Sequence, residues 1–272
     1  MTELRYNQTS PEVKKLQLAL LAKGYKLPKY GADGNLGGET WARLELFAGV
    51  EELDASKPLP ISIIQALLST PDVKHPDGYV RVKGDPSDVH GMRSWQQVDT
   101  IMLHQTGIWM NDTPDRFDTV NAHVGILKDH ATPIVQVHDL LAYCHHGNKA
   151  NGFSIGIEIN GHFPGLVKAF DPKRHSSAGP SERQIQSTRK ALAWIMEEAK
   201  AGGGQIRHII PHRTSNGSKP SDPGEVAWKE IGIWAQNNLG LADKGPGWLV
   251  GTGVPIPGDW DGRAQYQKYK YA

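Results

Sequence analysis

The side chains best suited to chemistry in this chain are histidines, and they are concentrated in its second half. The chain has 272 residues and twelve histidines, ten of which lie between His104 and His212. Residues 98–103 and 205–210 are rich in β-prone side chains, so both histidines are expected near the ends of strands. The carboxyl ends of strands are common places for functional sites. A histidine in such a position can also be a purely structural residue.

Asp222 is a further candidate, and two interpretations of it are open. The order Asp222, Pro223, Glu225 is typical of an ordinary helix start in which the aspartate is the cap. Together with His104 and His212, however, Asp222 would complete a set of two neutral imidazoles and one carboxylate. Three such ligands leave a position for water on a zinc ion.

Glu158 is an acid in an otherwise apolar predicted strand. Within residues 153–159 a phenylalanine and three isoleucines face one way, and Glu158 faces the other way with Ser154 and Gly156. Carboxylates are seldom buried unless they are paired, hydrogen-bonded or close to a metal. Glu158 is therefore a candidate catalytic group, and an ion pair with a lysine or arginine is the alternative.

Cys144 is the only cysteine of the chain, which excludes an internal disulfide and a cysteine-rich zinc module. It is flanked by His145 and His146, so a thiol nucleophile is an alternative to metal chemistry. Neighbouring residues of a strand point to opposite faces, however, and a small buried cysteine is the commoner case.

Regular elements surround these candidates. Residues 123–127 and 133–137 predict a hairpin. Residues 181–199 predict a helix that begins with a capping box of Ser181 and Gln184. Strands that alternate with helices indicate an α/β domain for this part of the chain.

The front of the chain predicts three short helices, of which the first begins at Ser10 and Pro11 and the last covers 61–68. Its ordered pattern is V-x-x-L-Q at 13–17, Gly24-Tyr25, and D-G-x-x-G-x-x-T at 33–40. Taken singly, these residues suit the turns and caps of any small bundle. As an ordered set, over about residues 9–68, they resemble the helical peptidoglycan-binding domain.

Length and composition limit the possible functions. A length of 272 residues suggests about two domains, and 38% hydrophobic residues, or about 49% with the 30 glycines added, is a globular composition that excludes disorder. The charges nearly balance, with 30 basic and 29 acidic residues, so no nucleic-acid partner is expected. The chain has no apolar run long enough for a membrane span and no apolar core of a secretory signal at its start.

Five motifs of the second half occur in a family order: IMLHQTG, NAHVGILKDHATPIVQV, CHHGN, SIGIEING and PHRTSNGSKPSDPGEVAW. Over about residues 96–237 they resemble the zinc N-acetylmuramoyl-L-alanine amidases of type 2, which are relatives of the peptidoglycan recognition proteins. The resemblance implies that His104, His212 and Asp222 hold one Zn²⁺ ion and that Glu158 is the general base.

The resemblance also has departures. Relatives commonly have a basic residue two places before the metal aspartate, where this chain has Pro220, and Lys219 stands one place earlier. Lys219 is therefore the candidate for stabilising the transition state. Ala122 stands where some relatives have a catalytic tyrosine, so Glu158 would carry the proton chemistry alone. The candidates for the second shell or the substrate side of the site are His123, His146 and Asn160.

The expected organisation has four parts. They are a helical peptidoglycan-binding domain over 1–70, a linker with a segment leading into the next domain over 71–95, a catalytic domain over 96–240 and a tail of unknown role over 241–272. The expected fold class is an α/β catalytic domain, with a central mixed β-sheet flanked by helices, preceded by a small three-helix domain.

The implied function is hydrolysis of the amide between N-acetylmuramic acid and L-alanine by zinc-activated water. A wall-binding module without a signal peptide suggests a monomeric phage endolysin, which is made in the cytoplasm and reaches the cell wall in the periplasm through a permeabilised membrane. Peptidoglycan is the expected partner, with no membrane insertion. An injected toxin and a recycling enzyme are weaker alternatives. A cysteine hydrolase using Cys144 and a non-catalytic peptidoglycan-binding protein are the rival functions.

Overall fold

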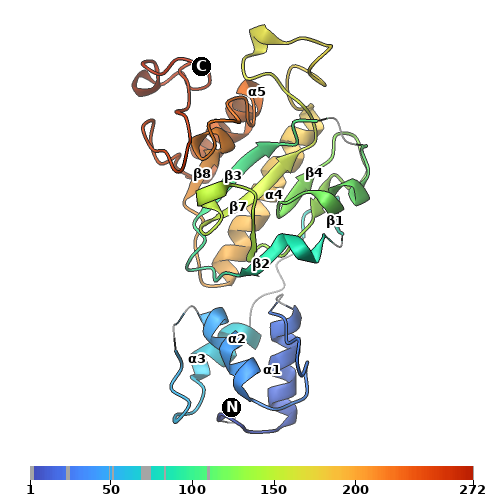
Figure 1. Cartoon of the computed structure of the whole chain (residues 1–272), viewed down its shortest axis with the longest axis vertical. Coiled ribbons are helices and arrows are strands. Elements are labelled where there is room, and N and C mark those ends of the chain that lie inside the picture. The colour runs from blue at the N-terminus through green and yellow to red at the C-terminus, as the bar shows by residue number, and fades with distance from the viewer. Residues whose placement is uncertain are drawn as a thin grey trace.

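The computed structural model describes residues 3–22, 25–48, 50, 52–68, 75–82, 84–108 and 111–271. Three helices open the chain and pack against one another apart from the sheet (Figure 1). Their buried apolar side chains, which include Leu16, Leu44 and Leu67, belong to the main hydrophobic cluster of the chain. This confirms the predicted three-helix start. The helices are α1 (Pro11–Ala22), α2 (Gly38–Ala48) and α3 (Ile61–Leu68).

Gln17 organises the loop between α1 and α2. Its buried amide donates to Asp33 Oδ1 and to Thr40 Oγ1, both at 2.8 Å, and its carbonyl oxygen accepts from the backbone N–H of Gly34 at 2.7 Å. Gly34 has φ +86, a conformation that favours glycine. The V-x-x-L-Q and D-G-x-x-G-x-x-T patterns are therefore two halves of one hydrogen-bonded structure. Gly24 of the same pattern lies outside the described residues.

A six-stranded mixed sheet with the order β1-β5-β4-β7-β3-β8 forms the centre of the second half. The pair β4 and β5 is the predicted antiparallel hairpin, and β4, β7, β3 and β8 run parallel. This confirms the predicted α/β class. The strands of this sheet are β1 (Tyr79–Arg81), β3 (Thr100–Gln105), β4 (Val124–Ile126), β5 (Ile134–Gln136), β7 (Ser154–Ile159) and β8 (His208–Pro211).

Helix α4 (Glu182–Ala201) covers one face of the sheet (Figure 1). The predicted capping box of Ser181 and Gln184 is present, and the helix buries Ile185, Leu192 and Ile195. None of the helices among the described residues is long and apolar enough to cross a membrane.

The last helical stretch corrects one interpretation of Asp222. Helix α5 (Glu225–Ala227) begins after Gly224, which occupies the N-cap with φ 102, and continues through a π-helical turn into α6 (Trp234–Leu239). Asp222 is therefore not the helix cap. Glycine can adopt the positive φ that is required at this N-cap position. Because Gly224 is the N-cap, Asp222 lies before the helix.

Residues 71–95, which were expected to contain the linker, also include strands. β1 extends the main sheet by pairing with β5, and β2 (Val89–Met92) pairs with β6 (Ala142–Cys144) in a separate two-stranded sheet. Residues from Tyr79 onward therefore pack with the second half of the chain. The C-terminal segment lies beside β8 and α5, at the upper left of Figure 1.

Candidate active site

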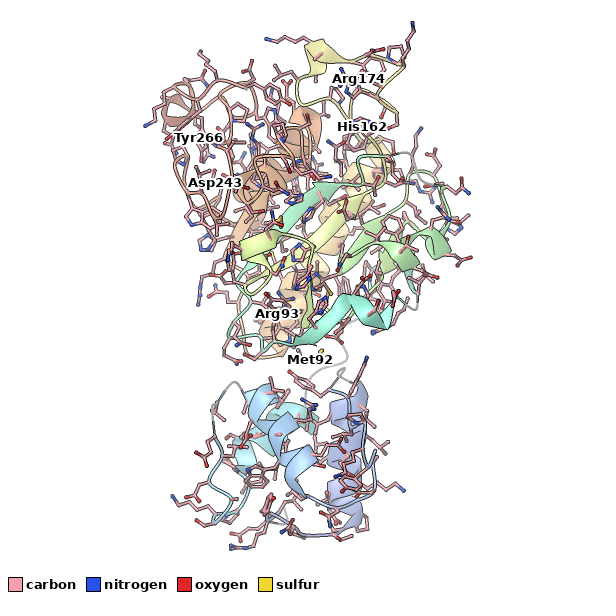
Figure 2. All side chains as sticks on the ribbon, in the orientation of Figure 1. Met92, Arg93, His162, Arg174, Asp243 and Tyr266 are labelled. Atoms are coloured by element: carbon pink, nitrogen blue, oxygen red, sulfur yellow. The ribbon has the colours of Figure 1, made fainter. Side chains whose placement is uncertain are left out.

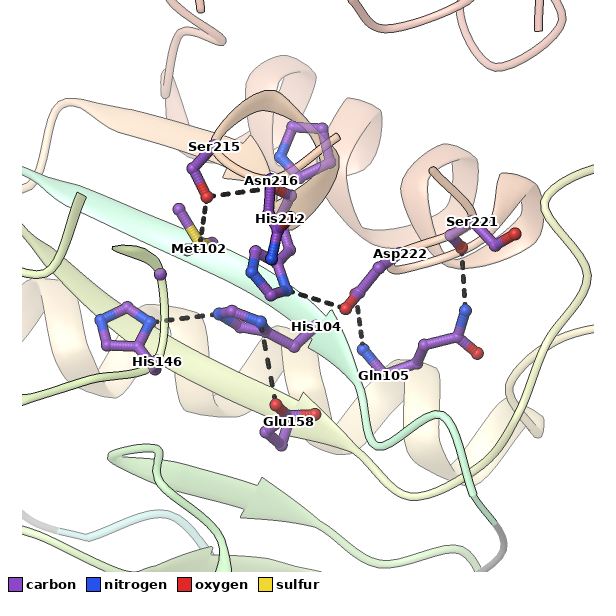
Figure 3. A network of polar contacts seen from close by, with 12 residues as sticks. Met102, His104, Gln105, His146, Glu158, His212, Ser215, Asn216, Ser221 and Asp222 are labelled. Atoms are coloured by element: carbon purple, nitrogen blue, oxygen red, sulfur yellow. Dashed lines mark hydrogen bonds and ion pairs between the residues drawn. The ribbon is translucent and has the colours of Figure 1, made fainter. Parts of the chain in front are cut away.

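The parallel strands bring the predicted groups together at their carboxyl ends. His104 on β3 and Glu158 on β7 are register partners, so their side chains lie on the same face. His212 follows directly after β8, which pairs with β3 on its other side. The site is therefore assembled at the carboxyl ends of three neighbouring strands, as Figure 3 shows.

His104, His212 and Asp222 form a compact, buried cluster. Each offers a nitrogen or oxygen ligand atom, and these atoms lie within 4.8 Å of one another. His212 Nδ1 is 2.9 Å from Asp222 Oδ2, and Asp222 Oδ1 accepts the backbone N–H of Gln105 at 2.8 Å. The two segments that carry the cluster, β3 and the loop after β8, are thus bonded to each other.

The hydrogen bonds of His104 leave one ring nitrogen free. His146 Nε2 donates to the carbonyl of Ser154 at 3.2 Å, so His146 Nδ1 accepts from His104 Nε2 at 3.1 Å. His104 Nδ1 is then unprotonated, and within the described part of the chain it is buried with no hydrogen-bond partner. Burial holds the pKa of His104 well below its usual range, and the neighbouring His212 adds to this effect.

This donor set fits a metal ion. Two imidazoles and a carboxylate are ligands that zinc accepts, and a neutral imidazole with a free lone pair is the form that binds it. A buried nitrogen without a partner is costly unless another group supplies the missing interaction. Residues His104, His212 and Asp222 can therefore hold a zinc ion.

His146 is the group that orients His104, and a glycine on the neighbouring strand leaves space for its ring. The ring lies over Gly156 of β7, where an added Cβ would come within 2.6 Å of His146 Nδ1. His146 is buried, and burial lowers its pKa to about 3, so the ring stays neutral. Its position behind His104 indicates a supporting role.

His123 lies inside the protein. It is fully buried, the N–H of Gly156 donates to its Nδ1 at 3.0 Å, and its Nε2 lies 2.8 Å from the carbonyl oxygen of Ala142. The guanidinium of Arg93 lies 2.8 Å from the same Nε2. Both ring nitrogens of His123 thus have partners inside the protein, and its role on the second shell or the substrate side of the site stays a prediction.

Asn160 is likewise fully buried, and its backbone carbonyl accepts from the Gln184 side chain of α4 at 2.8 Å. It therefore joins the sheet to the helix, and its substrate-side role stays a prediction. Asn160 Nδ2 also lies 3.4 Å from Asp112 Oδ1.

Glu158 stands next to the cluster with a free carboxylate oxygen. Its Oε1 lies 3.7 Å from His104 Nδ1, and its Oε2 is buried with no hydrogen-bond partner among the described residues. Burial raises the pKa of Glu158 well above its usual value, and the negative charge of Asp222 adds to this effect. The charge of Lys219 acts in the opposite direction. A carboxyl group with a raised pKa is suited to accept and return a proton.

Lys219 is exposed on the loop between His212 and Asp222. Its positive charge lowers the pKa of both Glu158 and His104 as a minor cause.

Two residues of the site carried no clear signal in the sequence. Gln105 holds the aspartate through its backbone N–H, and its side-chain amide donates to the carbonyl of Ser221 at 2.8 Å. It follows the predicted strand 98–103 and lies within the motif IMLHQTG, but neither observation indicates this role. Arg93 is buried and donates to the carbonyls of Asn151 and Leu140, contacts that no local pattern predicts.

The thiol alternative has little support from the geometry. Cys144 is fully buried, and this burial raises its pKa to about 12, which disfavours the nucleophilic thiolate. His145 points away into a stack with His90, with ring centroids 3.9 Å apart.

Comparisons with known proteins give one family match and several distant structural similarities. Residues 94–225 match the family described as N-acetylmuramoyl-L-alanine amidase. None of the curated proteins matches the chain. One similar solved structure is the endolysin amidase LysCS from Clostridium intestinale URNW, with 16% identity, a TM-score of 0.43, and coverage of 62% of this chain and 99% of that one. Another is bumblebee PGRP-SA, with 13% identity, a TM-score of 0.40, and coverage of 59% and 95%. The second half of the chain thus matches the N-acetylmuramoyl-L-alanine amidase family over residues 94–225, which is just under half of the whole chain.

Proposed function

We propose that this protein is a zinc-dependent peptidoglycan hydrolase that cleaves the amide between N-acetylmuramic acid and L-alanine. The observation that carries the proposal is the position of Glu158 beside a cluster of three potential metal ligands. A free carboxylate oxygen next to His104, His212 and Asp222 is the pairing that metal-assisted amide hydrolysis requires.

A zinc ion held by these residues would supply a lowered pKa for water and a polarised substrate carbonyl. Glu158 takes a proton from the attacking water as the oxygen–carbon bond forms. It then returns the proton to the leaving nitrogen as the carbon–nitrogen bond breaks, which leaves a carboxyl group on the muramoyl lactyl side and a free amino group on alanine. Proton transfer of this kind contributes about 10²–10⁴-fold in rate.

The remaining groups support this step. Lys219, from its exposed loop, would stabilise the negative charge that develops on the carbonyl oxygen. His146 keeps His104 in the tautomer with a free Nδ1. Such supporting hydrogen bonds commonly change metal affinity or activity by about 10–100-fold.

The division of the chain into modules is part of the proposal. The helical segment 1–70 would bind peptidoglycan, and the domain over 96–240 would carry the hydrolase. A module that holds the enzyme on an insoluble polymer raises the effective concentration of cleavable bonds. This pairing suits an endolysin that degrades the bacterial wall.

The test is the release of free L-alanine amino termini from purified peptidoglycan. We expect the wild type to release them, EDTA to stop the release, and added zinc to restore it. Activity that persists in EDTA would contradict the metal mechanism. A protein that binds the wall in every arm but releases no stem peptide would instead be a binding protein.

A further inference from the structure

The C-terminal segment 241–271 lies on the loop that carries two of the three candidate ligands. It leaves the sheet where Ile209 of β8 donates its N–H to the carbonyl of Ala242 at 2.8 Å. It then pairs with the start of the loop, since the N–H of Val254 donates to the carbonyl of Arg213 at 2.8 Å. The N–H of Val250 likewise donates to the carbonyl of Thr214 at 3.0 Å. The contact is therefore between backbones.

Glycine allows the close approach of the two chains. A Cβ added at Gly217, in the middle of the loop, would lie 2.4 Å from the carbonyl oxygen of Thr252. A Cβ at Gly251 would lie 3.1 Å from the carbonyl oxygen of Ser215. The loop and the segment thus fit only with small residues at these positions.

Arg213 joins the two ends of the ligand loop to the segment. Its backbone N–H donates to the carbonyl of Asp222 at 3.1 Å, and its guanidinium donates to the carbonyl of Pro220. The guanidinium also donates to the carbonyl of Pro255 at 2.9 Å. Because Arg213 follows His212 directly, one side chain links the histidine end of the loop, the aspartate end and the C-terminal segment.

Two aromatic rings of the segment enclose this arginine. Its guanidinium carbon lies 4.8 Å from the ring centre of Trp260 and 5.2 Å from that of Tyr271. The hydroxyl of Tyr271 is 2.8 Å from Ser221 Oγ, next to Asp222. Burial lowers the pKa of Arg213 to about 10, which leaves it charged at neutral pH. A buried cation against aromatic faces is a favourable and well-defined contact.

We propose that residues 241–271 are a strap that holds the 212–222 loop in its ligand-binding geometry, with Arg213 and Tyr271 as positioning residues. Neither residue belongs to the cluster of ligands, and both act on it through the loop. The part of this inference that concerns zinc rests on the proposed function, whereas the part that concerns the order of the loop does not.

The chain offers a matched pair of variants. Tyr271→Phe removes the hydroxyl that contacts Ser221. Tyr266→Phe removes the hydroxyl of another tyrosine of the same segment, which donates to Asp243 of that segment; Figure 2 labels this tyrosine and its aspartate. Arg213→Lys keeps the charge and loses the planar group that donates to two carbonyls.

The experiment measures hydrogen exchange of peptides covering 212–222 in the chelated full-length protein. Loss of one hydrogen bond corresponds to about twofold to tenfold faster exchange. We expect this increase in Tyr271→Phe, a larger one in Arg213→Lys, and wild-type exchange of these peptides in Tyr266→Phe. Equal exchange of the loop in Tyr271→Phe and Tyr266→Phe would overturn the proposal, as would wild-type exchange in Arg213→Lys.

A second measurement follows the transfer of zinc from the loaded protein to a chromogenic chelator. We expect faster zinc loss from Tyr271→Phe and Arg213→Lys, with Tyr266→Phe close to the wild type. The melting temperature of each variant is measured as well. If the segment only stabilised the fold, the rate of zinc loss would follow the drop in melting temperature in all three variants. That result would overturn the positioning role. If the wild type holds no zinc, the proposed function fails, and the exchange experiment still decides whether the strap orders the loop.

Discussion

His104 and Glu158 are register partners on the parallel strands β3 and β7, and His104 Nδ1 lies 3.7 Å from Glu158 Oε1. Paired residues of adjacent strands share one face of a sheet, so this proximity is fixed by the backbone ladder and needs no flexible loop. The acid is thereby held beside a candidate metal ligand. This relationship gives the most direct test of the mechanism.

Replacement of Glu158 by glutamine should abolish most of the activity and leave the metal in place. The amide keeps the size of the side chain but cannot accept the proton, so kcat should fall by about 10²–10⁴-fold. Peptidoglycan turnover and bound zinc would be measured on the same preparation. A variant that loses zinc together with activity would point to a structural role for Glu158.

Replacement of Gly156 by alanine should weaken metal binding from a distance. The added methyl group would displace His146 and with it the hydrogen bond to His104, and loss of such support commonly lowers metal affinity by about 10–100-fold. The matched control is Gly152→Ala, where an added Cβ would meet no atom within 4 Å. Equal zinc affinity in the two variants would show that His146 does not position the ligand.

The parts of this site that sequence reasoning found are those with local signals. His104 and Glu158 were visible as a strand end and as a polar residue in an apolar alternation. Asp222 was ambiguous because its local sequence also fits a helix cap, and the structure decides against the cap by starting the helix after Gly224.

The burial of individual side chains and the contacts between residues distant in the sequence had no such local signal. His123 lies in a family-like motif, yet it is fully buried against Arg93, which is thirty positions away in the sequence. The contact of Arg213 with Trp260 joins segments that are separated by even more residues. Contacts of this kind depend on how the chain returns to itself, which neither periodicity nor capping patterns record.

Replacement of Cys144 by alanine should leave hydrolysis unchanged. The thiol is fully buried and its pKa is raised to about 12, so it does not supply a nucleophile near neutral pH. Turnover of peptidoglycan would be compared before and after the change, with melting temperature as the control for folding. Loss of turnover in a protein that melts like the wild type would favour the cysteine hydrolase instead.

The metal-free protein should lose stability at acid pH, and the pKa values of its buried histidines determine the pH range of this loss. Burial holds the pKa of His123 well below 6.5, and the unfolded chain takes up a proton near pH 6.5. Below that pH the unfolded state binds more protons than the folded state, so the free energy of unfolding should fall as pH decreases. The slope from one such group is at most about 1.4 kcal/mol per pH unit.

The variant for this test is His123→Gln, which cannot titrate. Urea unfolding of the chelated protein at pH 7 and pH 5 should show a smaller loss of stability in the variant than in the wild type, even if the variant is less stable at both values. An unchanged difference between the two pH values would mean that His123 is not a source of the acid sensitivity.

Replacement of Gln17 by alanine should separate wall binding from hydrolysis. The change removes four hydrogen bonds that fix the loop between α1 and α2, and it leaves the carboxylate of Asp33 and the N–H of Gly34 without this partner. Loss of the partner of the buried Gly34 N–H costs about 1–3 kcal/mol. Binding to insoluble peptidoglycan should therefore weaken, while cleavage of a small soluble muramoyl peptide should remain near the wild-type rate. Leu18→Ala, at an exposed position of the same helix, is the control and should alter neither.

If Gln17→Ala binds the wall like the wild type, the loop is not part of the binding surface. If it loses soluble turnover as well, the two modules do not act independently.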